Sequence, residues 1–217
     1  GYSSNFLYRG NPAVSLIDIE AFRAAPLIPD PFPYAMVPGF VRQESMARIH
    51  EDYPDVSQGG SFPLASLEYG PVFAELCDEL RGEPLRAAFE EKVEIDLSQR
   101  PTTLTVRGRC RERDGQIHTD TKSKLITVLV YLNGPWEAEG GRLRLLRSPD
   151  NLEDYVAEVP PEPGTLLCFR NGPRAWHGHA PFEGVRRALQ LNWVTDEAAV
   201  RKSERRHGLS ALVKRFN

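Results

Sequence analysis

The stretch Gly115-Gln116-Ile117-His118-Thr119-Asp120 stands just before a nearly continuous apolar run at residues 125–132. In an extended segment, alternate side chains point to the same side, so His118 and Asp120 face the same way. One imidazole nitrogen and one carboxylate oxygen can then reach a single ion. This stretch therefore predicts half of a metal site at the entrance to a buried strand.

A second imidazole is available in Trp176-His177-Gly178-His179. His177 and His179 would face the same way on a strand, so the pattern alone does not choose between them. Two histidines and one carboxylate on one face of a metal, with the other positions open, form the facial triad of non-haem Fe(II) sites. The alternative for each histidine is a ring that simply hydrogen-bonds to a hydroxyl or a carbonyl.

The chain after Pro101 has the pattern of a β-structure. Short apolar or alternating runs recur at regular intervals, separated by Gly and Pro, which is typical of a sandwich or barrel. The expected strands are residues 102–106, 125–132, 142–146, 156–159, 165–169, 176–181 and 186–194. A short basic helix is expected from Leu209 onward.

The first hundred residues have a different pattern. Residues 1–14 have no clear periodicity, and a helix is expected over residues 15–25, with Ser15 as its N-cap. A short strand is expected at residues 34–37, and further helices at residues 42–53 and 71–92. The last of these should break near Gly82-Glu83-Pro84 into two helices in tandem. The predicted fold class is α+β, mainly β.

The predicted architecture is a double-stranded β-helix, a cupin-like jelly roll with N-terminal helices packed on its outside. We expect a single domain over residues 1–217. Residues 1–100 form its mostly helical part, residues 101–196 the jelly-roll core, and residues 197–217 a C-terminal tail. A chain of this length is long enough to bury a sizeable core.

The composition limits the function and the compartment. The net charge of −3 argues against a protein built to bind nucleic acid. No segment approaches the roughly 18 apolar residues that span a bilayer, and the N-terminal residues do not have the pattern of a signal peptide. Three cysteines without paired spacing fit a reducing compartment. We therefore expect a cytoplasmic protein.

An adjacent pair of arginines lies in the last expected strand. Arg187 would share its face with Leu189, Leu191 and Trp193, whereas Arg186 would share its face with Ala188, Gln190 and Asn192. The more apolar face should point into the barrel, where an arginine can bind a carboxylate through two parallel hydrogen bonds. This argument favours Arg187. The alternative is that both arginines are surface charges.

Taken together, these motifs resemble the 2-oxoglutarate and Fe(II)-dependent dioxygenase superfamily, in particular its prolyl-hydroxylase-like branch. The resemblance covers roughly residues 104–194. It rests on the His118-Thr119-Asp120 pair, the strand ending in Tyr131-Leu132-Asn133, the Gly140-Gly141-Arg142-Leu143 segment, His177 with Pro181 four residues later, and Arg187.

The resemblance implies a set of roles. His118, Asp120 and His177 would be the Fe(II) ligands, because in that branch a Pro follows the second His by four residues. Arg187 and Tyr131 would bind the far carboxylate of 2-oxoglutarate, and Leu143 would be an apolar wall beside it. O₂ would be the oxidant and ascorbate the reductant in vitro. The expected reaction is hydroxylation of an unactivated C–H bond, with release of succinate and CO₂.

One departure from the branch concerns the substrate. Prolyl hydroxylases of this type often have a Tyr in the strand before the HxD pair, whereas this chain has Arg107-Gly108-Arg109 there. This puts a prolyl substrate in doubt. The two arginines are either a positive rim of the pocket or a solvated strand face. The prime substrate is then a small molecule or a protein side chain, and the oligomeric state is open.

Two other functions use the same residues. Zn²⁺ held by the same triad could activate water for hydrolysis. A jelly-roll module could also bind a metal or a small acid without turnover. The hydrolase gives no clear role to Arg187 or Tyr131, and a module without turnover would usually have lost part of the triad or the arginine. Only the oxygenase should convert 2-oxoglutarate to succinate.

Overall fold

The computed structural model describes residues 14–216, so most of the segment 1–14 lies outside the described residues. Two antiparallel sheets form the β part. The larger has the strand order β1-β7-β4-β9-β3-β2 and the smaller the order β6-β5-β8. The strands are β1 (Tyr34–Val37), β2 (Phe62–Pro63), β3 (Thr102–Cys110), β4 (Lys124–Tyr131), β5 (Leu143–Leu146), β6 (Tyr155–Val159), β7 (Leu166–Arg170), β8 (His177–Gly178) and β9 (Gly184–Val194). This arrangement confirms the predicted jelly roll.

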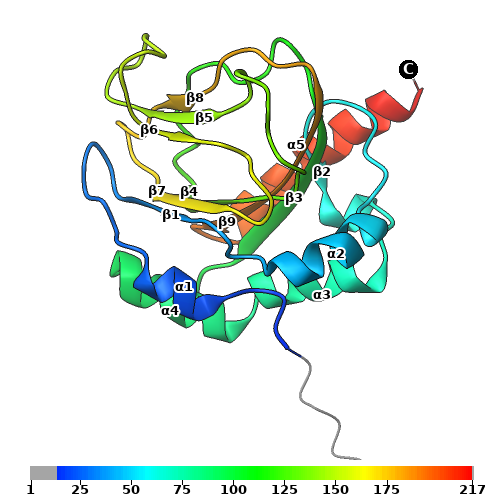
Figure 1. Ribbon diagram of the computed structural model, residues 1–217, viewed down its shortest axis with the longest axis horizontal. Coiled ribbons are helices and arrows are strands. Elements are labelled where there is room, and N and C mark those ends of the chain that lie inside the picture. The colour runs from blue at the N-terminus through cyan, green and yellow to red at the C-terminus, as the bar shows by residue number, and fades with distance from the viewer. Residues whose placement is uncertain (1–13, 217) are drawn as a thin grey trace, which may run out of the picture.

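Four helices cover the outer face of the larger sheet, as Figure 1 shows. They are α1 (Ile19–Ala24), α2 (Met46–Asp52), α3 (Pro71–Leu80) and α4 (Glu83–Val93). The predicted break gives two tandem helices, and each begins with a Pro in its first turn, where a missing N–H costs nothing. The cap predicted at Ser15 is wrong. Helix α1 begins after Asp18, whose side chain accepts the Ala21 N–H at 2.9 Å.

The apolar side chains form two clusters, one on each face of the larger sheet. The outer cluster joins the helices to the sheet, and it contains Phe22, Phe89 and Trp193 in ring-to-ring contact. The inner cluster lies between the two sheets and includes Tyr131, Leu143 and Phe169. The outer face of the sheet is therefore as apolar as a protein interior, because helices cover it.

A long helix, α5 (Glu197–Phe216), follows β9 directly. The prediction of a short helix from Leu209 was wrong. Asp196 accepts the Ala199 N–H at 2.9 Å and so caps a helix that starts earlier. This helix contacts β2, β3 and β9 at one side of the barrel (Figure 1).

None of the helices within residues 14–216 is both long and apolar enough to cross a membrane.

Candidate metal centre

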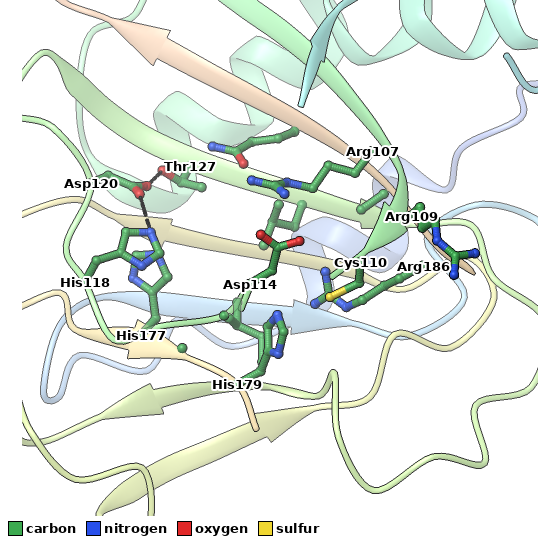
Figure 2. Close-up of a pocket in the computed structure, with 16 residues that line it drawn as sticks. Arg107, Arg109, Cys110, Asp114, His118, Asp120, Thr127, His177, His179 and Arg186 are labelled. Carbon is green, nitrogen blue, oxygen red and sulfur yellow. Dashed lines mark hydrogen bonds and ion pairs between the residues drawn. The ribbon is translucent and has the colours of Figure 1, made fainter. Parts of the chain in front are cut away.

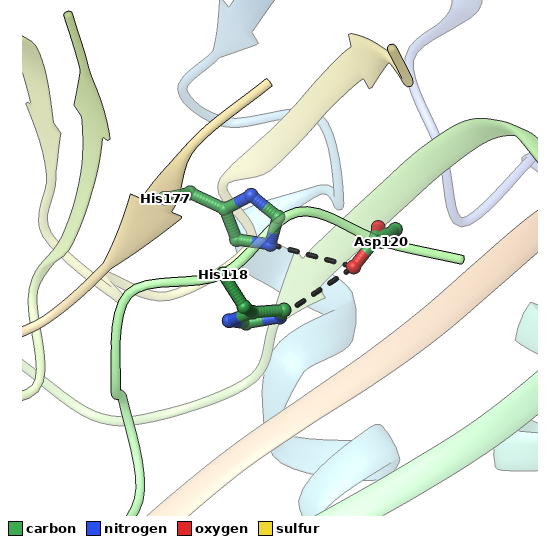
Figure 3. Close-up of side chains that lie close together, drawn as sticks. All are labelled: His118, Asp120 and His177. Carbon is green, nitrogen blue, oxygen red and sulfur yellow. Dashed lines mark ion pairs between the residues drawn. The ribbon is translucent and has the colours of Figure 1, made fainter. Parts of the chain in front are cut away.

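Three potential ligand atoms converge at one end of the barrel. His118 and Asp120 lie in the segment between β3 and β4, and His177 begins β8. The Nε2 atoms of His118 and His177 each lie 3.5 Å from Asp120 Oδ1, as Figure 3 shows. All three ligand atoms lie within 4.8 Å of one another. The sequence prediction of a shared site for these residues therefore agrees with the geometry.

Backbone pairing fixes the two histidines side by side. The His118 N–H donates to the His177 carbonyl, and the His177 N–H donates to the His118 carbonyl, each at 3.0 Å. The ring orientation is fixed as well. His118 Nδ1 donates to the Gln116 carbonyl at 2.9 Å, and His177 Nδ1 donates to the Ala175 carbonyl at 2.8 Å. Since a carbonyl only accepts, each Nδ1 carries the proton, and each Nε2 lone pair is free for a metal.

The Asp120 carboxylate is oriented through its second oxygen. Thr127 Oγ1 donates to Asp120 Oδ2, and Asn192 Nδ2 donates to Thr127 Oγ1 at 2.8 Å. Burial alone would raise the pKa of Asp120, but the two imidazoles hold this pKa far below its usual range. The nearby Asp120 carboxylate in turn raises the pKa of His118. The site thus presents an ionised carboxylate between two imidazoles.

A cavity of about 130 Å³ extends from this cluster into the barrel. Its apolar walls include Leu129, Leu143 and Ala188. Leu143 is therefore a wall residue, in the position predicted for it. Figure 2 shows Arg186 and Cys110 at the end of the cavity away from His118, Asp120 and His177.

Arg186 is the arginine of the cavity, and the orientation predicted for Arg187 is wrong. Arg186 is 8% exposed, and its Nε donates to the Gly141 carbonyl at 2.9 Å. Arg187 points to the other face, where its guanidinium lies 4.9 Å from the centre of the Tyr53 ring. The error has a physical cause. The more apolar face of β9 is the outer face, which the helices cover, and the barrel interior is the polar face.

The position of Tyr131 supports Arg186 as a carboxylate-binding residue. Its ring is fully buried, and the Arg186 guanidinium lies 5.4 Å from the ring centre. The Tyr131 hydroxyl is buried without a hydrogen-bond partner among the described residues. Burial raises the pKa of Tyr131, so the hydroxyl keeps its proton and can donate it. A buried donor next to a guanidinium is suited to binding a carboxylate.

Comparison with known proteins agrees with this geometry. Residues 109–195 match the sequence profile of the 2OG-Fe(II) oxygenase superfamily. The matched segment contains His118, Asp120 and His177. Members of the superfamily are enzymes that use Fe(II), 2-oxoglutarate and O₂. No curated protein matches the chain.

Solved prolyl hydroxylases have a similar fold. A Pseudomonas putida prolyl-4-hydroxylase is 16% identical, with a TM-score of 0.54, over 76% of this chain and 89% of that chain. A prolyl 4-hydroxylase from Phytophthora capsici is 17% identical, with a TM-score of 0.53, over 89% and 70%. A viral collagen prolyl hydroxylase from Paramecium bursaria Chlorella virus-1, solved with 2-oxoglutarate, is 15% identical, with a TM-score of 0.50, over 75% and 96%. At these identities, the likeness shows the shared fold.

The residues present fit the superfamily's metal and co-substrate. Two imidazoles and one carboxylate are the donor set of a facial Fe(II) site. The Arg186 guanidinium offers a carboxylate a charged donor in the cavity, and the Tyr131 hydroxyl without a described partner is buried beside this arginine.

His179 lines the cavity but does not join the three ligand atoms. Its Nδ1 donates to the Ala180 carbonyl at 2.9 Å. Burial and the nearby Arg186 lower the pKa of His179 to about 4, so the ring is neutral. Gly115 packs flat against this ring, and a Cβ at residue 115 would lie 2.3 Å from His179 Cε1. His179 is thus a wall residue, and Gly115 makes room for it.

Several residues of the site were not recognised in the sequence. Thr127 on β4 and Asn192 on β9 hold Asp120 in place through hydrogen bonds. Nothing in the sequence distinguishes these two residues from other strand residues. Arg107 and Arg109 both line the cavity, and only Arg109 is exposed. The solvated alternative for the two arginines is therefore wrong for Arg107.

Proposed function

We propose that this chain is an Fe(II)- and 2-oxoglutarate-dependent hydroxylase of an unactivated C–H bond. One observation carries the proposal. The buried Arg186 lines the same cavity as two histidines and a carboxylate, and the Tyr131 hydroxyl, which has no partner among the described residues, is buried beside that arginine. A hydrolase that used Zn²⁺ in the same triad would have no use for that carboxylate-binding pair.

Each group has a defined task in this proposal. His118, Asp120 and His177 hold Fe(II), and Arg186 with Tyr131 binds the distal carboxylate of 2-oxoglutarate. Bound Fe(II), together with 2-oxoglutarate and O₂, supplies the oxidising chemistry that turns C–H into C–OH with release of succinate and CO₂. The chain's own contribution is to orient the co-substrate and to exclude water.

The walls of the cavity serve that exclusion. Leu129, Leu143 and Ala188 form the apolar part of the wall, where water finds no hydrogen-bonding side chain. Thr127 keeps Asp120 from rotating, so the carboxylate oxygen nearest the histidines stays in place.

The proposal has three further parts, which concern the prime substrate, the reductant and the compartment. The prime substrate is a small molecule or a protein side chain. Ascorbate would serve as the reductant in vitro. A cytoplasmic location is proposed because Cys77, Cys110 and Cys168 are all free.

The test is release of succinate from 2-oxoglutarate with Fe(II), O₂ and ascorbate, in the absence of a prime substrate. We expect slow turnover that EDTA abolishes and that the variant His118→Ala lacks. Gln116→Ala is the matched control, because this exposed side chain lies in the same loop and only its backbone carbonyl contacts His118. If 2-oxoglutarate fails to bind and the purified protein contains Zn²⁺, the oxygenase proposal is wrong and hydrolysis is the next hypothesis.

A further inference from the structure

A second cavity of about 310 Å³ adjoins the three proposed metal ligands. It shares Arg107, His118, Asp120 and Gln190 with the first cavity, so the metal centre lies where the two cavities meet. Residues along the inner face of β9 show that the two cavities follow one another along this strand. Arg186 and Ala188 line only the first cavity, Gln190 lines both, and Asn192 lines only the second.

The second cavity is lined almost entirely by polar side chains. They come from β3, β9, the loop that carries Asp120, and helix α5, and they are Ser61, Thr103, Thr105, Arg107, His118, Thr119, Asp120, Thr121, Lys124, Gln190, Asn192, Ser203 and Arg206. An apolar ligand would displace water from these polar groups without replacing its interactions, at a cost for each. The lining therefore favours a polar ligand.

Three cations surround this polar space. Arg107 lies on β3, Lys124 begins β4, and Arg206 lies on α5. Figure 2 shows the Arg107 side chain extending from β3 toward Thr127 and Asp120. None of the three forms an ion pair with a carboxylate whose position the structure describes. Burial lowers the pKa of Lys124, the Asp120 carboxylate opposes this shift, and the nearby Arg206 and Arg107 add to it. Three mutually repelling cations around one cavity make an anion-binding site.

The charges of the loaded enzyme strengthen this argument, which rests on the proposed function. The positive charges of Fe(II) and Arg186 are balanced by Asp120 and the two carboxylates of 2-oxoglutarate. The one further acid in the first cavity, Asp114, is paired with Arg111 at 2.9 Å. Arg107 and Lys124 then have only Asp114 and Asp120 as acidic neighbours and form no ion pair with them in the described structure, and cations without an ion pair in a partly buried space are costly. A negative charge from the prime substrate would compensate them.

We propose that the prime substrate carries an acidic group, a carboxylate or a phosphate, that binds between Arg107, Lys124 and Arg206. The group anchors the substrate in the second cavity, and the C–H bond to be hydroxylated then points to the metal centre. Because this anchor is separate from Arg186, the substrate acid and 2-oxoglutarate do not compete for one arginine. The hydroxyls and amides of β3 and β9 bind the remaining polar groups of the substrate.

The first test measures anion binding to the metal-free protein and so needs no turnover. Inorganic phosphate and acetate are each titrated into the wild type by calorimetry and by amide chemical shifts. We expect Arg107→Gln and Lys124→Gln each to weaken binding of the preferred anion about 10- to 100-fold. Lys122→Gln is the matched control, because Lys122 is exposed and does not line the cavity.

Two further variants separate this site from its neighbours. Arg107→Lys keeps the charge and should retain most of the binding, which distinguishes a lost charge from a misfolded strand. Arg186→Gln should remove any anion binding at the co-substrate arginine and leave the binding that depends on Arg107 and Lys124. If phosphate and acetate bind only through Arg186, or bind equally well to the Lys124→Gln and wild-type proteins, the proposal is wrong.

The second test uses turnover and distinguishes the two acids. Polar carboxylic acids and phosphate esters are screened for stimulation of succinate release by the wild type. Stimulation by one class, with a KM for that compound raised in Lys124→Gln and unchanged in Lys122→Gln, supports the site and names its acid. Anion binding without any conversion of 2-oxoglutarate would support the site and contradict the proposed reaction. Stimulation only by uncharged compounds would overturn the site and leave the oxygenase in place.

Discussion

Replacing Arg186 by Gln should remove most of the affinity for 2-oxoglutarate, whereas the same change at Arg187 should not. The Arg186 guanidinium lies in the cavity at 8% exposure, beside a hydroxyl that has no partner in the described structure. Loss of one member of a buried charge pair costs about 3–5 kcal/mol, because the other charge is left uncompensated. That cost corresponds to a Kd raised by roughly 10²–10³-fold or more.

The assay is titration of 2-oxoglutarate into the protein loaded with Mn(II), which replaces Fe(II) without turnover, followed by succinate release with Fe(II). Arg186→Lys should give an intermediate loss, because it keeps the charge but not the planar fork that grips both carboxylate oxygens. Arg187→Gln is the control. It removes a contact with the Tyr53 ring, worth about 0.5–1 kcal/mol of stability, and should leave the Kd within a few-fold of wild type.

The reasoning fails if Arg187→Gln loses 2-oxoglutarate binding while Arg186→Gln keeps it. The melting temperature of each variant shows whether a loss of binding comes from misfolding. Gln at residue 186 can still donate a hydrogen bond toward the Gly141 carbonyl, so the melting temperature should change little. A variant that has lost binding but kept its melting temperature reports on the cavity alone.

Three further predictions concern the metal, the tyrosine and the thiols. Asp120→Ala should lower the affinity for Mn(II), measured by electron paramagnetic resonance, by more than about 100-fold. Thr127→Val should lower it by about 10- to 100-fold. An unchanged affinity in Asp120→Ala would exclude Asp120 as a ligand. Tyr131→Phe should raise the Kd of 2-oxoglutarate about 10-fold in calorimetry, yet leave the free energy of unfolding within about 1 kcal/mol of wild type, because the lost hydroxyl has no partner in the described structure; an unchanged Kd would remove Tyr131 from the binding site. Burial raises the pKa of the Cys168 thiol from about 9 to about 12, so its contribution to stability is complete below pH 9 and is lost at about 1.4 kcal/mol per pH unit as the pH rises toward 12. Urea unfolding at several pH values should show a shallower decline for Cys168→Ala, and equal slopes would contradict the assigned cause.

Strand alternation in the sequence was sufficient to predict two features of the site. His118 and Asp120 had to face one side, and the buried run after them had to be a central strand. Both are seen in the structure. The choice of His177 over His179 did not follow from alternation, because both residues line the cavity. It depends on the tertiary pairing of His118 with His177, which no local pattern encodes.

The arginine was misplaced for a reason that extends beyond this chain. Apolar alternation on β9 identifies a face that is buried, but not which neighbour buries it. Here the helices bury Leu189, Leu191 and Trp193 in the outer cluster. The inner face carries Arg186, Gln190 and Asn192, because this part of the barrel holds ligands. In a jelly roll covered by helices, the more polar face of a central strand is therefore the better guide to the site.

The outward face of β9 explains why the fold tolerates buried charges on the inward side of the sheet. A guanidinium in a cavity is unfavourable until an anion reaches it, so Arg186 and Arg107 reduce the stability of the empty protein. The outer cluster offsets this cost, since it contains a continuous set of fully buried aromatic and aliphatic side chains on the opposite side of the same strands. One strand thus separates two tasks: its outward residues stabilise the fold, and its inward residues are free to bind the co-substrate at one end and the substrate at the other. Substitutions on the outward face should therefore lower the melting temperature without changing ligand affinities. Substitutions on the inward face should weaken ligand binding and change the melting temperature little.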